Sequence, residues 1–163
     1  MDEKLPILKF EQQIVQAMSD HRVVVEAAET DAEKSTEVPA MLLRAKLDQG
    51  GMIGVTEPRR IAAMSLALYV AEKQRLRLGR YDHPDLHGDR KHPGYGVVVV
   101  DEAHERGVNQ DLIMAFLKQL LRRRQNLKAV MVCRHAGFFI TLRVLTKTLR
   151  RAMKFCVHLT KIT

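Results

Sequence analysis

Four short apolar runs alternate with longer segments of helical period along the chain. The runs at 23–25 and 97–100 consist of valine alone, which is typical of strands buried on both faces of a parallel sheet. The runs at 52–56 and 127–132 predict two more strands. Because helical segments separate the runs, the pattern indicates a parallel α/β sheet with right-handed crossovers. Ligands bind such sheets at the carboxyl ends of the strands, so we expect the segments that follow the strands to carry the chemistry.

Three helices are predicted between these strands. The first covers about 34–47, and the second runs from Arg60 to about Leu78. In the third helix, four apolar side chains fall on one face: Leu112, Phe116, Leu117 and Leu120. Between the second helix and the valine run at 97–100, the residues from 80 to 96 are rich in His, Pro, Asp and Gly and predict a loop.

Length and composition are those of one ordinary domain. The chain has 163 residues, of which 46% are hydrophobic and 28% charged, as in a soluble globular protein. No apolar run is long enough to cross a bilayer, and the start of the chain shows neither a secretory signal nor a transit peptide. Cys133 and Cys156 form no CxxC pair and indicate a reducing compartment. We therefore expect an intracellular protein, in the nucleus or the cytoplasm, without a membrane partner.

The formal net charge of +8 is unevenly distributed. After Asp111 the chain has 12 basic residues and no acidic one, which leaves 15 basic against 19 acidic residues in the rest. A basic segment of this density attracts polyanions by releasing their counterions, so nucleic acid is the first partner to consider and an acidic membrane surface the second. The alternative is a solvated helix face, which charge alone does not exclude.

The segment between the first strand and the first helix has part of the chemistry of a phosphate loop. It reads Ala-Glu-Thr-Asp-Ala-Glu-Lys-Ser-Thr from 28 to 36. Such a loop needs a lysine for the phosphates and a hydroxyl for magnesium, which Lys34 and the residues after it provide. It also needs glycines so that backbone N–H groups can reach the phosphates, but Ala28 and Glu33 occupy the two glycine positions. Taken alone, the Lys-Ser-Thr sequence is more typical of an ordinary helix start.

Two consecutive acids directly follow the buried valine run at 97–100. Asp101 is placed to hold magnesium, and Glu102 is placed to orient or deprotonate an attacking water. On most surface turns, two such acids are simply solvated. Here the sequence Asp-Glu-Ala-His-Glu-Arg from 101 to 106 continues after a strand that is expected to be buried on both faces.

Taken together, the segments resemble the DEAH-box RNA helicases. The sequence from 101 to 106, followed by Asn109 and Asp111, is similar to their motif II. Further matches lie in the same order at 5–7, 29–39 and 54–63, and the resemblance covers roughly 5–79 and 96–132. It implies a three-layer parallel sheet of RecA-like (P-loop NTPase) type, incomplete. In this reading residues 1–135 form the ATP-binding domain, shortened between 80 and 96, and residues 136–163 form a basic amphipathic tail.

The resemblance also implies ligands and roles for individual residues. ATP would contact Thr30, Lys34, Ser35, Thr36 and Asp101, with Mg²⁺ on Ser35 and Asp101. Glu102 would activate water, and His104 would couple the ATP site to a partner lobe. Single-stranded RNA would contact Thr56, Arg59 and Arg60 through its phosphate backbone. A protein partner that supplies regulation is also expected.

Several positions depart from the family pattern. Ala28, Asp31 and Glu33 stand where the phosphate loop is expected to have glycine or another small residue. Each added carboxylate would cost on the order of a few kcal/mol at about 4 Å from a triphosphate and an effective dielectric of about 20. We therefore expect weak or absent ATP binding. Cys133-Arg134-His135 also replaces the family's Ser-Ala-Thr, and no second lobe is recognised.

Three functional readings follow. The first is an ATP-dependent RNA helicase-like ATP-binding domain that is inactive alone. The second is a catalytically dead module that binds RNA or protein, and the third is a truncated product without function. For the tail, apolar positions alternate with basic ones from Phe139 to Lys154 and suggest a basic amphipathic helix. Such a helix could cover the edge of the sheet, bind a polyanion or have no selected role.

Overall fold

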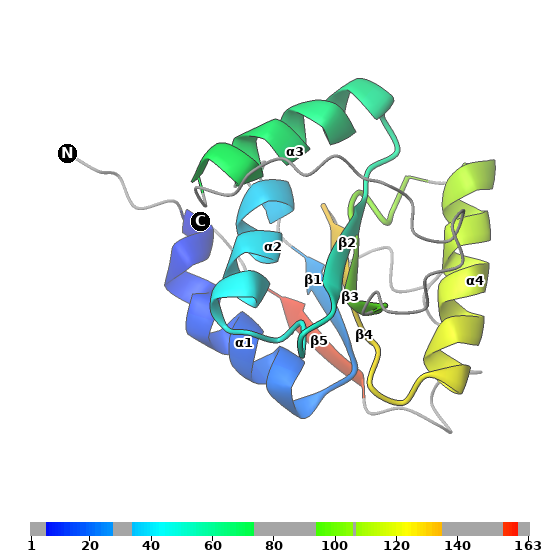
Figure 1. Ribbon diagram of the computed structural model, residues 1–163, viewed down its shortest axis with the longest axis horizontal. Helices are drawn as coiled ribbons and strands as arrows, with labels where there is room; N and C mark the ends of the chain where they lie inside the picture. The colour runs from blue at the N-terminus through cyan, green and yellow to red at the C-terminus, as the bar shows by residue number, and fades with distance from the viewer. Residues whose placement is uncertain (1–5, 28–33, 74–93, 106, 135–154, 160–163) are drawn as a thin grey trace.

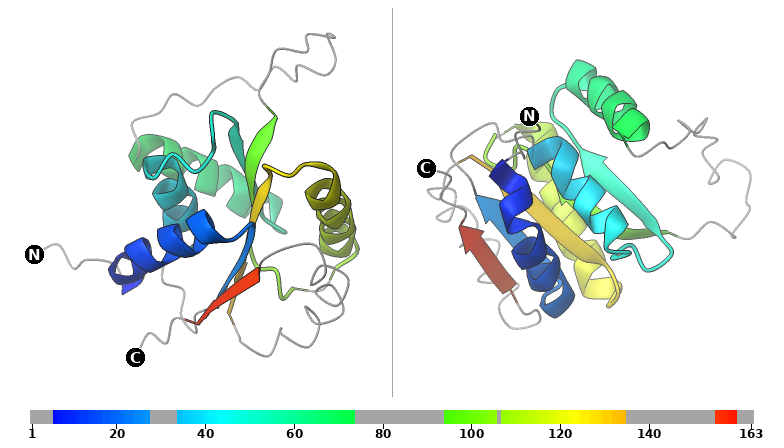
Figure 2. Two further views of the ribbon diagram at one scale, coloured as in Figure 1. Left: turned by 90° about the horizontal axis from the view of Figure 1, so that it is seen from below. Right: turned by 90° about the vertical axis from the view of Figure 1, so that its left-hand side faces the viewer.

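A parallel sheet with helices on both faces forms the framework of the protein (Figures 1 and 2). The computed structural model describes residues 6–27, 34–73, 94–105, 107–134 and 155–159. In these residues the sheet has five strands in the order β2-β3-β4-β1-β5, and every neighbouring pair is parallel. The strands are β1 Val23–Ala27, β2 Met52–Thr56, β3 Tyr95–Val100, β4 Lys128–Cys133 and β5 Phe155–Leu159.

The helices cover the sheet as two outer layers. They are the 3₁₀ helix η1 Pro6–Phe10, α1 Glu11–Asp20, α2 Lys34–Arg44, α3 Arg60–Lys73 and α4 Val108–Arg123. The helices α1 and α2 lie on one face of the sheet, and α4 lies on the other (Figure 1). The helix α3 lies beside α2 (Figure 2). The expected three-layer parallel α/β architecture of RecA-like type is therefore confirmed.

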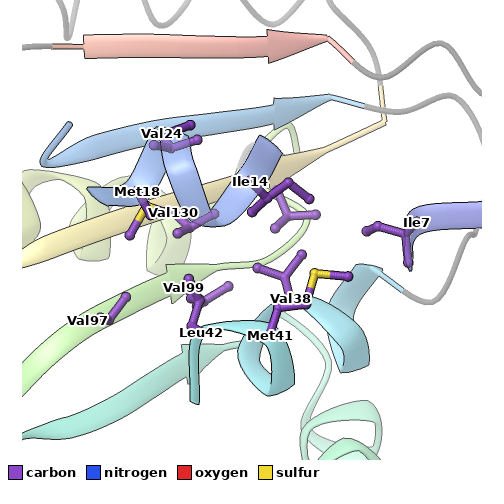
Figure 3. Packing of buried hydrophobic residues seen from close by; sticks show 12 residues of the cluster. Ile7, Ile14, Met18, Val24, Val38, Met41, Leu42, Val97, Val99 and Val130 are labelled. Carbon is purple, nitrogen blue, oxygen red and sulfur yellow. The ribbon is translucent and has the colours of Figure 1, made fainter. Parts of the chain in front are cut away.

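Alternation along the buried strands divides the core in two. Val24, Val97 and Val130 point toward α1 and α2, where they pack on Ile14 and Met41 (Figure 3). The residues that alternate with them along the strands, such as Val25, Ala129 and Met131, pack toward α4. All residues of β1 and β4 are buried. This explains why the central strands read as nearly unbroken apolar runs rather than as polar–apolar alternation.

Element boundaries agree with the sequence pattern except where local geometry ends an element early. The strand β2 has the predicted bounds, and β3 begins two residues before its valine run. The helix α2 ends at Arg44 rather than near 47. Just beyond it, Lys46 and Gln49 have φ of 53° and Gly50 has φ of 78°. Residues in this left-handed region cannot continue a right-handed helix, so the chain turns into β2.

The buried face of α4 is not the face that its apolar period indicates. Leu117 is buried, but Leu112 is 53% exposed, Phe116 57% and Leu120 43%. The helix instead buries Gln110, Met114, Leu117 and Leu121 against the sheet. One cause is polar: the Gln110 amide Nε2 donates to the carbonyl oxygen of Asp101 at 2.8 Å, which turns this side of the helix inward. A large apolar surface is thereby left on the outside.

The segment after β4 contributes one strand to the described structure. The strand β5 pairs with β1 in parallel, with Val23 opposite Phe155 and Ala27 opposite Leu159. It therefore extends the sheet beyond β1, within the range that the sequence reading assigned to the tail 136–163. The amphipathic helix predicted between Phe139 and Lys154 lies outside the described residues, as does most of the loop predicted at 80–96.

Candidate functional site

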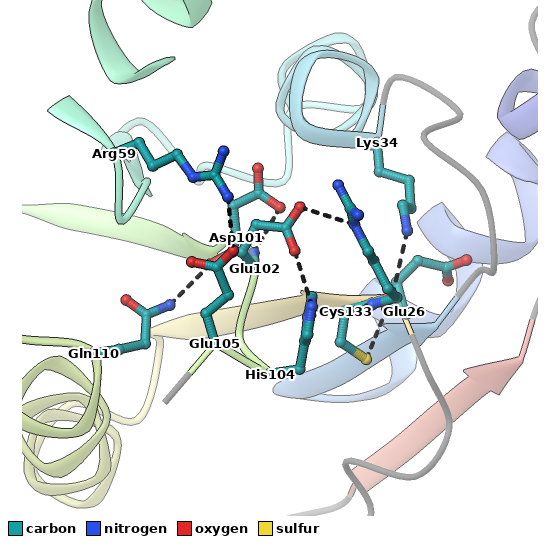
Figure 4. Close-up of polar contacts among 10 residues, drawn as sticks. Glu26, Lys34, Arg59, Asp101, Glu102, His104, Glu105, Gln110 and Cys133 are labelled. Atoms are coloured by element: carbon teal, nitrogen blue, oxygen red, sulfur yellow. Dashed lines mark hydrogen bonds and ion pairs between the residues drawn. The ribbon is translucent and has the colours of Figure 1, made fainter. Parts of the chain in front are cut away.

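A pocket of about 260 Å³ opens at the carboxyl edge of the sheet, where α2 begins and β3 and β4 end. The residues that line it come from four separate segments: Lys34, Ser35, Glu57, Arg59, Asp101, Glu102, Glu105, Val132, Cys133 and Arg134. Parallel strands bring these segments together, because all of their carboxyl ends lie at the same edge. Figure 4 shows polar contacts among several of these side chains, including Lys34, Arg59, Asp101, Glu102 and Glu105.

Lys34 is the first residue of α2 and is buried. Its ammonium Nζ donates to the carbonyl oxygen of Cys133 at 3.3 Å, which directs the side chain toward the end of β4 (Figure 4). Burial lowers the pKa of Lys34, and the negative charges nearby, above all that of Glu102, oppose this shift. The side chain is therefore a partly desolvated cation surrounded by acids.

Asp101 is held in a tightly bonded turn at the end of β3. Its backbone N–H donates to the carbonyl of Thr56 at 3.0 Å, and its Oδ1 accepts from the backbone N–H of Glu102 at 2.8 Å. The side chain is buried, and its second oxygen, Oδ2, accepts no hydrogen bond from the described residues. Glu102 has φ of 46°, a left-handed conformation that is costly for a residue with a side chain. The turn thus fixes one carboxylate oxygen and leaves the other available to a ligand.

Glu102 is engaged at both carboxylate oxygens. Its Oε2 lies 3.3 Å from His104 Nε2, and its Oε1 lies 3.5 Å from Arg134 Nε. The backbone N–H of Arg134 donates to His104 Nδ1 at 3.4 Å. Since Nδ1 accepts, a neutral His104 ring carries its proton on Nε2 and donates it to Glu102. Glu102, His104 and Arg134 thus form one connected cluster, of which Figure 4 labels Glu102 and His104.

The residues that follow β2 form the outer rim of the site. Arg59 lies 3.3 Å from Glu105 through Nη2 and Oε1, and 76% of its side chain is exposed. The hydroxyl of Thr56 is buried and makes no hydrogen bond in the described structure. Arg60 begins α3, and its side chain lies outside the described part. The rim therefore places the accessible guanidinium of Arg59 at the pocket.

The chain is similar to curated ATP-dependent RNA helicases over most of its length. It is 37% identical over 153 residues to an ATP-dependent RNA helicase HrpA homolog of Haemophilus influenzae, and 33% identical over 152 residues to HrpA of Escherichia coli. It is 32% identical over 156 residues to the probable ATP-dependent RNA helicase DHX40 of Homo sapiens. Each match takes in 78% of this chain. The resemblance to the DEAH-box RNA helicases is therefore confirmed.

The chain spans a small part of these helicases, 12% of each HrpA protein and 20% of DHX40. No protein-family model matches it. Among the described residues, no helix has the length and apolar character that a membrane span requires.

Only some of the site residues expected from the sequence lie together in the described structure. Lys34, Ser35, Asp101 and Glu102 line one pocket, and Arg59 lies at its rim. Thr36 follows in α2 and is half-buried, but it does not line the pocket. Thr30 and the departures Ala28, Asp31 and Glu33 lie outside the described residues.

Among the pocket residues that the sequence reading did not name as site residues, Glu57 and Arg134 add a charge directly after a strand. Glu57 lies in the pocket, and burial, together with nearby Asp101 and Glu102, raises its pKa. Arg134 was noted only as part of a changed motif, whereas in the structure it contacts Glu102. A charged residue directly after a strand end was the available signal in each case.

The charges that line the pocket nearly cancel. It has four carboxylates, from Glu57, Asp101, Glu102 and Glu105, against the cations of Lys34, Arg59 and Arg134. A polyphosphate therefore meets no net positive field here, unlike in a site built for anions.

The residues nevertheless fit a divalent cation. Hard cations such as Mg²⁺ take oxygen ligands, and the buried Oδ2 of Asp101 and the hydroxyl of Ser35 belong to the same pocket. No cluster of three or more metal-ligating side chains occurs among the described residues. Mg²⁺ typically binds through one or two carboxylates together with substrate phosphates, so these two groups would suffice if a nucleotide were present.

Proposed function

We propose that the chain is an RNA helicase-type ATP-binding domain whose carboxyl-edge pocket takes ATP with Mg²⁺. One observation carries the proposal: Lys34, Asp101 and Glu102 come from distant parts of the sequence and line the same pocket. Lys34 would neutralise the β and γ phosphates, and Ser35 with Asp101 would hold the metal. Mg²⁺ would neutralise charge on the phosphates, and Glu102 would orient the attacking water.

RNA is the proposed nucleic-acid ligand. Thr56, Arg59 and Arg60 would contact the phosphate backbone of a single strand, as the resemblance implies. The exposed guanidinium of Arg59 supports this role, since 76% of its side chain is exposed while it pairs with Glu105 in the described structure. Glu105, its partner, belongs to the same turn as Glu102, so occupation of the two sites could influence each other.

The isolated chain is proposed to be inactive in unwinding. By resemblance, a second lobe supplies the rest of the ATP site and of the strand channel, and this lobe is not recognised in the sequence. In addition, Arg134 and His104 occupy both oxygens of Glu102. Duplex unwinding by the purified chain that is lost in Glu102→Gln would contradict this part of the proposal.

Nucleotide binding is tested by titrating the full chain with a fluorescent ATP analogue in the presence and absence of MgCl₂. We expect Mg²⁺-dependent binding that Lys34→Met weakens by about tenfold or more, because the substitution keeps the aliphatic stem and removes the cation. The matched control is Lys9→Met, which removes an exposed cation that does not line the pocket. Circular dichroism of each variant checks that it is folded. Equal binding by Lys34→Met and the wild type would refute the assignment.

A second candidate is an RNA-binding module that does not use ATP. The near-cancelling charges of the pocket favour it, as do the sequence departures at Ala28, Asp31 and Glu33. Under this reading the native chain binds no nucleotide, whereas the triple substitution Ala28→Gly, Asp31→Gly, Glu33→Gly creates Mg²⁺-dependent binding. Micromolar nucleotide binding by the native chain would exclude the second candidate.

A further inference from the structure

Three arginines lie in a row at the end of the sheet opposite the pocket. Arg122 and Arg123 end α4, and Arg124 follows at the start of the turn into β4. In Figure 1, α4 runs down the side of the sheet from the edge that carries the pocket to the edge where β4 begins. We call Arg122, Arg123 and Arg124 the arginine cluster; all three are exposed.

The usual explanation for basic residues at a helix C-terminus is that they complement the free carbonyls and the negative end of the helix dipole. Here another residue has that role. Arg22 donates from Nη2 to the carbonyls of Leu121 at 2.7 Å and Arg124 at 2.6 Å, and from Nε to the carbonyl of Leu127 at 3.3 Å. The C-terminal end of α4 is thus already capped by a cation from the segment before β1. The charges of the arginine cluster are not needed for capping.

No carboxylate neutralises the arginine cluster within the described structure, where the observed ion pairs involve other residues. Three described segments lead into β1, β2 and β4, namely 20–22, 45–51 and 122–128. Together they carry six basic residues against two acidic ones. The basic residues are Arg22, Lys46, Arg122, Arg123, Arg124 and Lys128, and the acidic ones are Asp20 and Asp48. The pocket at the opposite edge has four acids against three cations. Among the described residues, the segments at the amino edge of the sheet therefore carry more net positive charge than the pocket at the carboxyl edge, which favours polyanions there.

The solvent face of α4 adds an aromatic ring to this charge. Phe116 is 57% exposed, although the spacing of apolar residues along α4 predicts that it is buried. Arg123 lies seven residues, or two helical turns, farther along the same face, at a rise of about 10 Å. Exposed aromatic rings stack on nucleobases, and guanidinium groups bind phosphate through paired hydrogen bonds. An aromatic ring and Arg123 on one face, with Arg122 and Arg124 next to Arg123 in the chain, match the two chemistries of a single RNA strand.

We propose that the solvent face of α4, with Phe116 and the arginine cluster, binds single-stranded RNA at a surface separate from Arg59. The inference rests on the proposed function only in taking RNA as the ligand. A second copy of the chain fits the surface less well, because each copy has a formal net charge of +8 and the two would repel. A membrane would need the apolar residues of α4 to insert into lipid, which the experiment separates from base stacking.

The test measures fluorescence anisotropy of a labelled 12-nucleotide oligouridylate with the full chain and no nucleotide, over a range of KCl concentrations. We expect Arg122→Gln/Arg123→Gln to weaken binding by about tenfold or more at low salt. The slope of log affinity against log salt should fall in magnitude by about 1.4, from about 0.7 per lost phosphate contact on a single strand. Lys9→Gln/Arg44→Gln is the matched control, because it removes the same charge from exposed positions on the other face of the sheet. Equal losses in the two double variants would overturn the inference, since net charge alone would then explain binding.

Aromatic stacking has its own variants. Phe116→Leu should weaken RNA binding by about tenfold, whereas Phe116→Tyr, which keeps the ring, should bind as the wild type does. Because the side chain is exposed, neither change should prevent folding. Equal RNA affinity of Phe116→Leu and the wild type would overturn the stacking contact. Binding of the wild type to phosphatidylcholine–phosphatidylserine vesicles, together with no effect of Arg122→Gln/Arg123→Gln on RNA, would overturn the inference in favour of a membrane surface.

The same assay separates this inference from the proposed function. If Arg59→Gln weakens RNA binding and Arg122→Gln/Arg123→Gln does not, the α4 surface is refuted and the proposed RNA contact stands. If only the double variant weakens binding, the α4 surface stands and the contact at Arg59 fails. ATP binding is measured independently, so loss of nucleotide affinity bears on the pocket alone.

Discussion

Arg22 should be one of the most important polar side chains for stability, since it joins the segment before β1 to the end of α4. Its guanidinium makes three hydrogen bonds to backbone carbonyls and a fourth, from Nη1, to Gln125 Oε1 at 3.3 Å. Burial lowers the pKa of this guanidinium, so the bonds compensate a desolvated charge. Loss of the side chain would leave the last carbonyls of α4 without their donor.

The expected magnitude follows from these contacts. A hydrogen bond from a charged donor contributes about 1.5–3 kcal/mol when its partner stays buried, but water can reach carbonyls at this edge and replace part of that. A cation at a partly buried helix C-terminus contributes up to about 2 kcal/mol. We therefore expect Arg22→Ala to lower the free energy of unfolding by about 2–3 kcal/mol. Arg22→Lys should lose about half as much, because a single ammonium cannot reach three carbonyls as a planar fork does.

Urea denaturation followed by circular dichroism at 25 °C measures this effect, with Lys9→Ala as the control for loss of an exposed cation. The control should change stability by no more than about 0.5 kcal/mol. In thermal unfolding, Arg22→Ala should lower Tm by about 4–10 °C for a chain of this size. If Arg22→Ala and Lys9→Ala cost the same, Arg22 does not cap α4, and the reasoning about the arginine cluster loses its basis.

Three further predictions concern packing and protonation. Leu121→Ala should cost about 2–5 kcal/mol in urea denaturation because Leu121 is buried, whereas Leu112→Ala should cost less than about 1 kcal/mol; similar costs would contradict the orientation of α4. Burial raises the pKa of Cys133 from 9.0 to about 11, so iodoacetamide at pH 8 should alkylate it about 100-fold more slowly in the folded than in the unfolded chain, as measured by mass spectrometry of the modified peptide. The hydrogen bond to buried Glu37 raises the pKa of Lys73, so the folded state binds this proton more tightly; its stabilising effect should be full below pH 10.5 and decline as the pH rises from 10.5 through the higher pKa of the folded state. Urea midpoints measured from pH 8 to 11 should therefore fall more steeply for the wild type than for Lys73→Met; parallel curves would show that the pair does not contribute.

Much of the framework could be read from the sequence because its signals are local. The all-valine run before Asp101 predicted a buried strand, and acids at its end predicted polar chemistry at the carboxyl edge; β3 and its turn have this arrangement. The rotation of α4 could not be read in the same way. The spacing of apolar residues along α4 favoured burial of Phe116, whereas the hydrogen bond from Gln110 to the carbonyl of Asp101 sets which side of the helix faces the sheet.

The sequence by itself determined the alternation of strands and helices, the parallel sheet and the resemblance to the DEAH-box RNA helicases, because periodicity and short motifs depend on neighbouring residues. Only the tertiary structure decided which charges meet. Arg134 contacts Glu102, Glu57 lies beside Asp101, and Arg22 reaches the end of α4 about 100 residues away. These contacts depend on which strands become neighbours in the order β2-β3-β4-β1-β5, and that order results from packing of the whole chain rather than from any one segment.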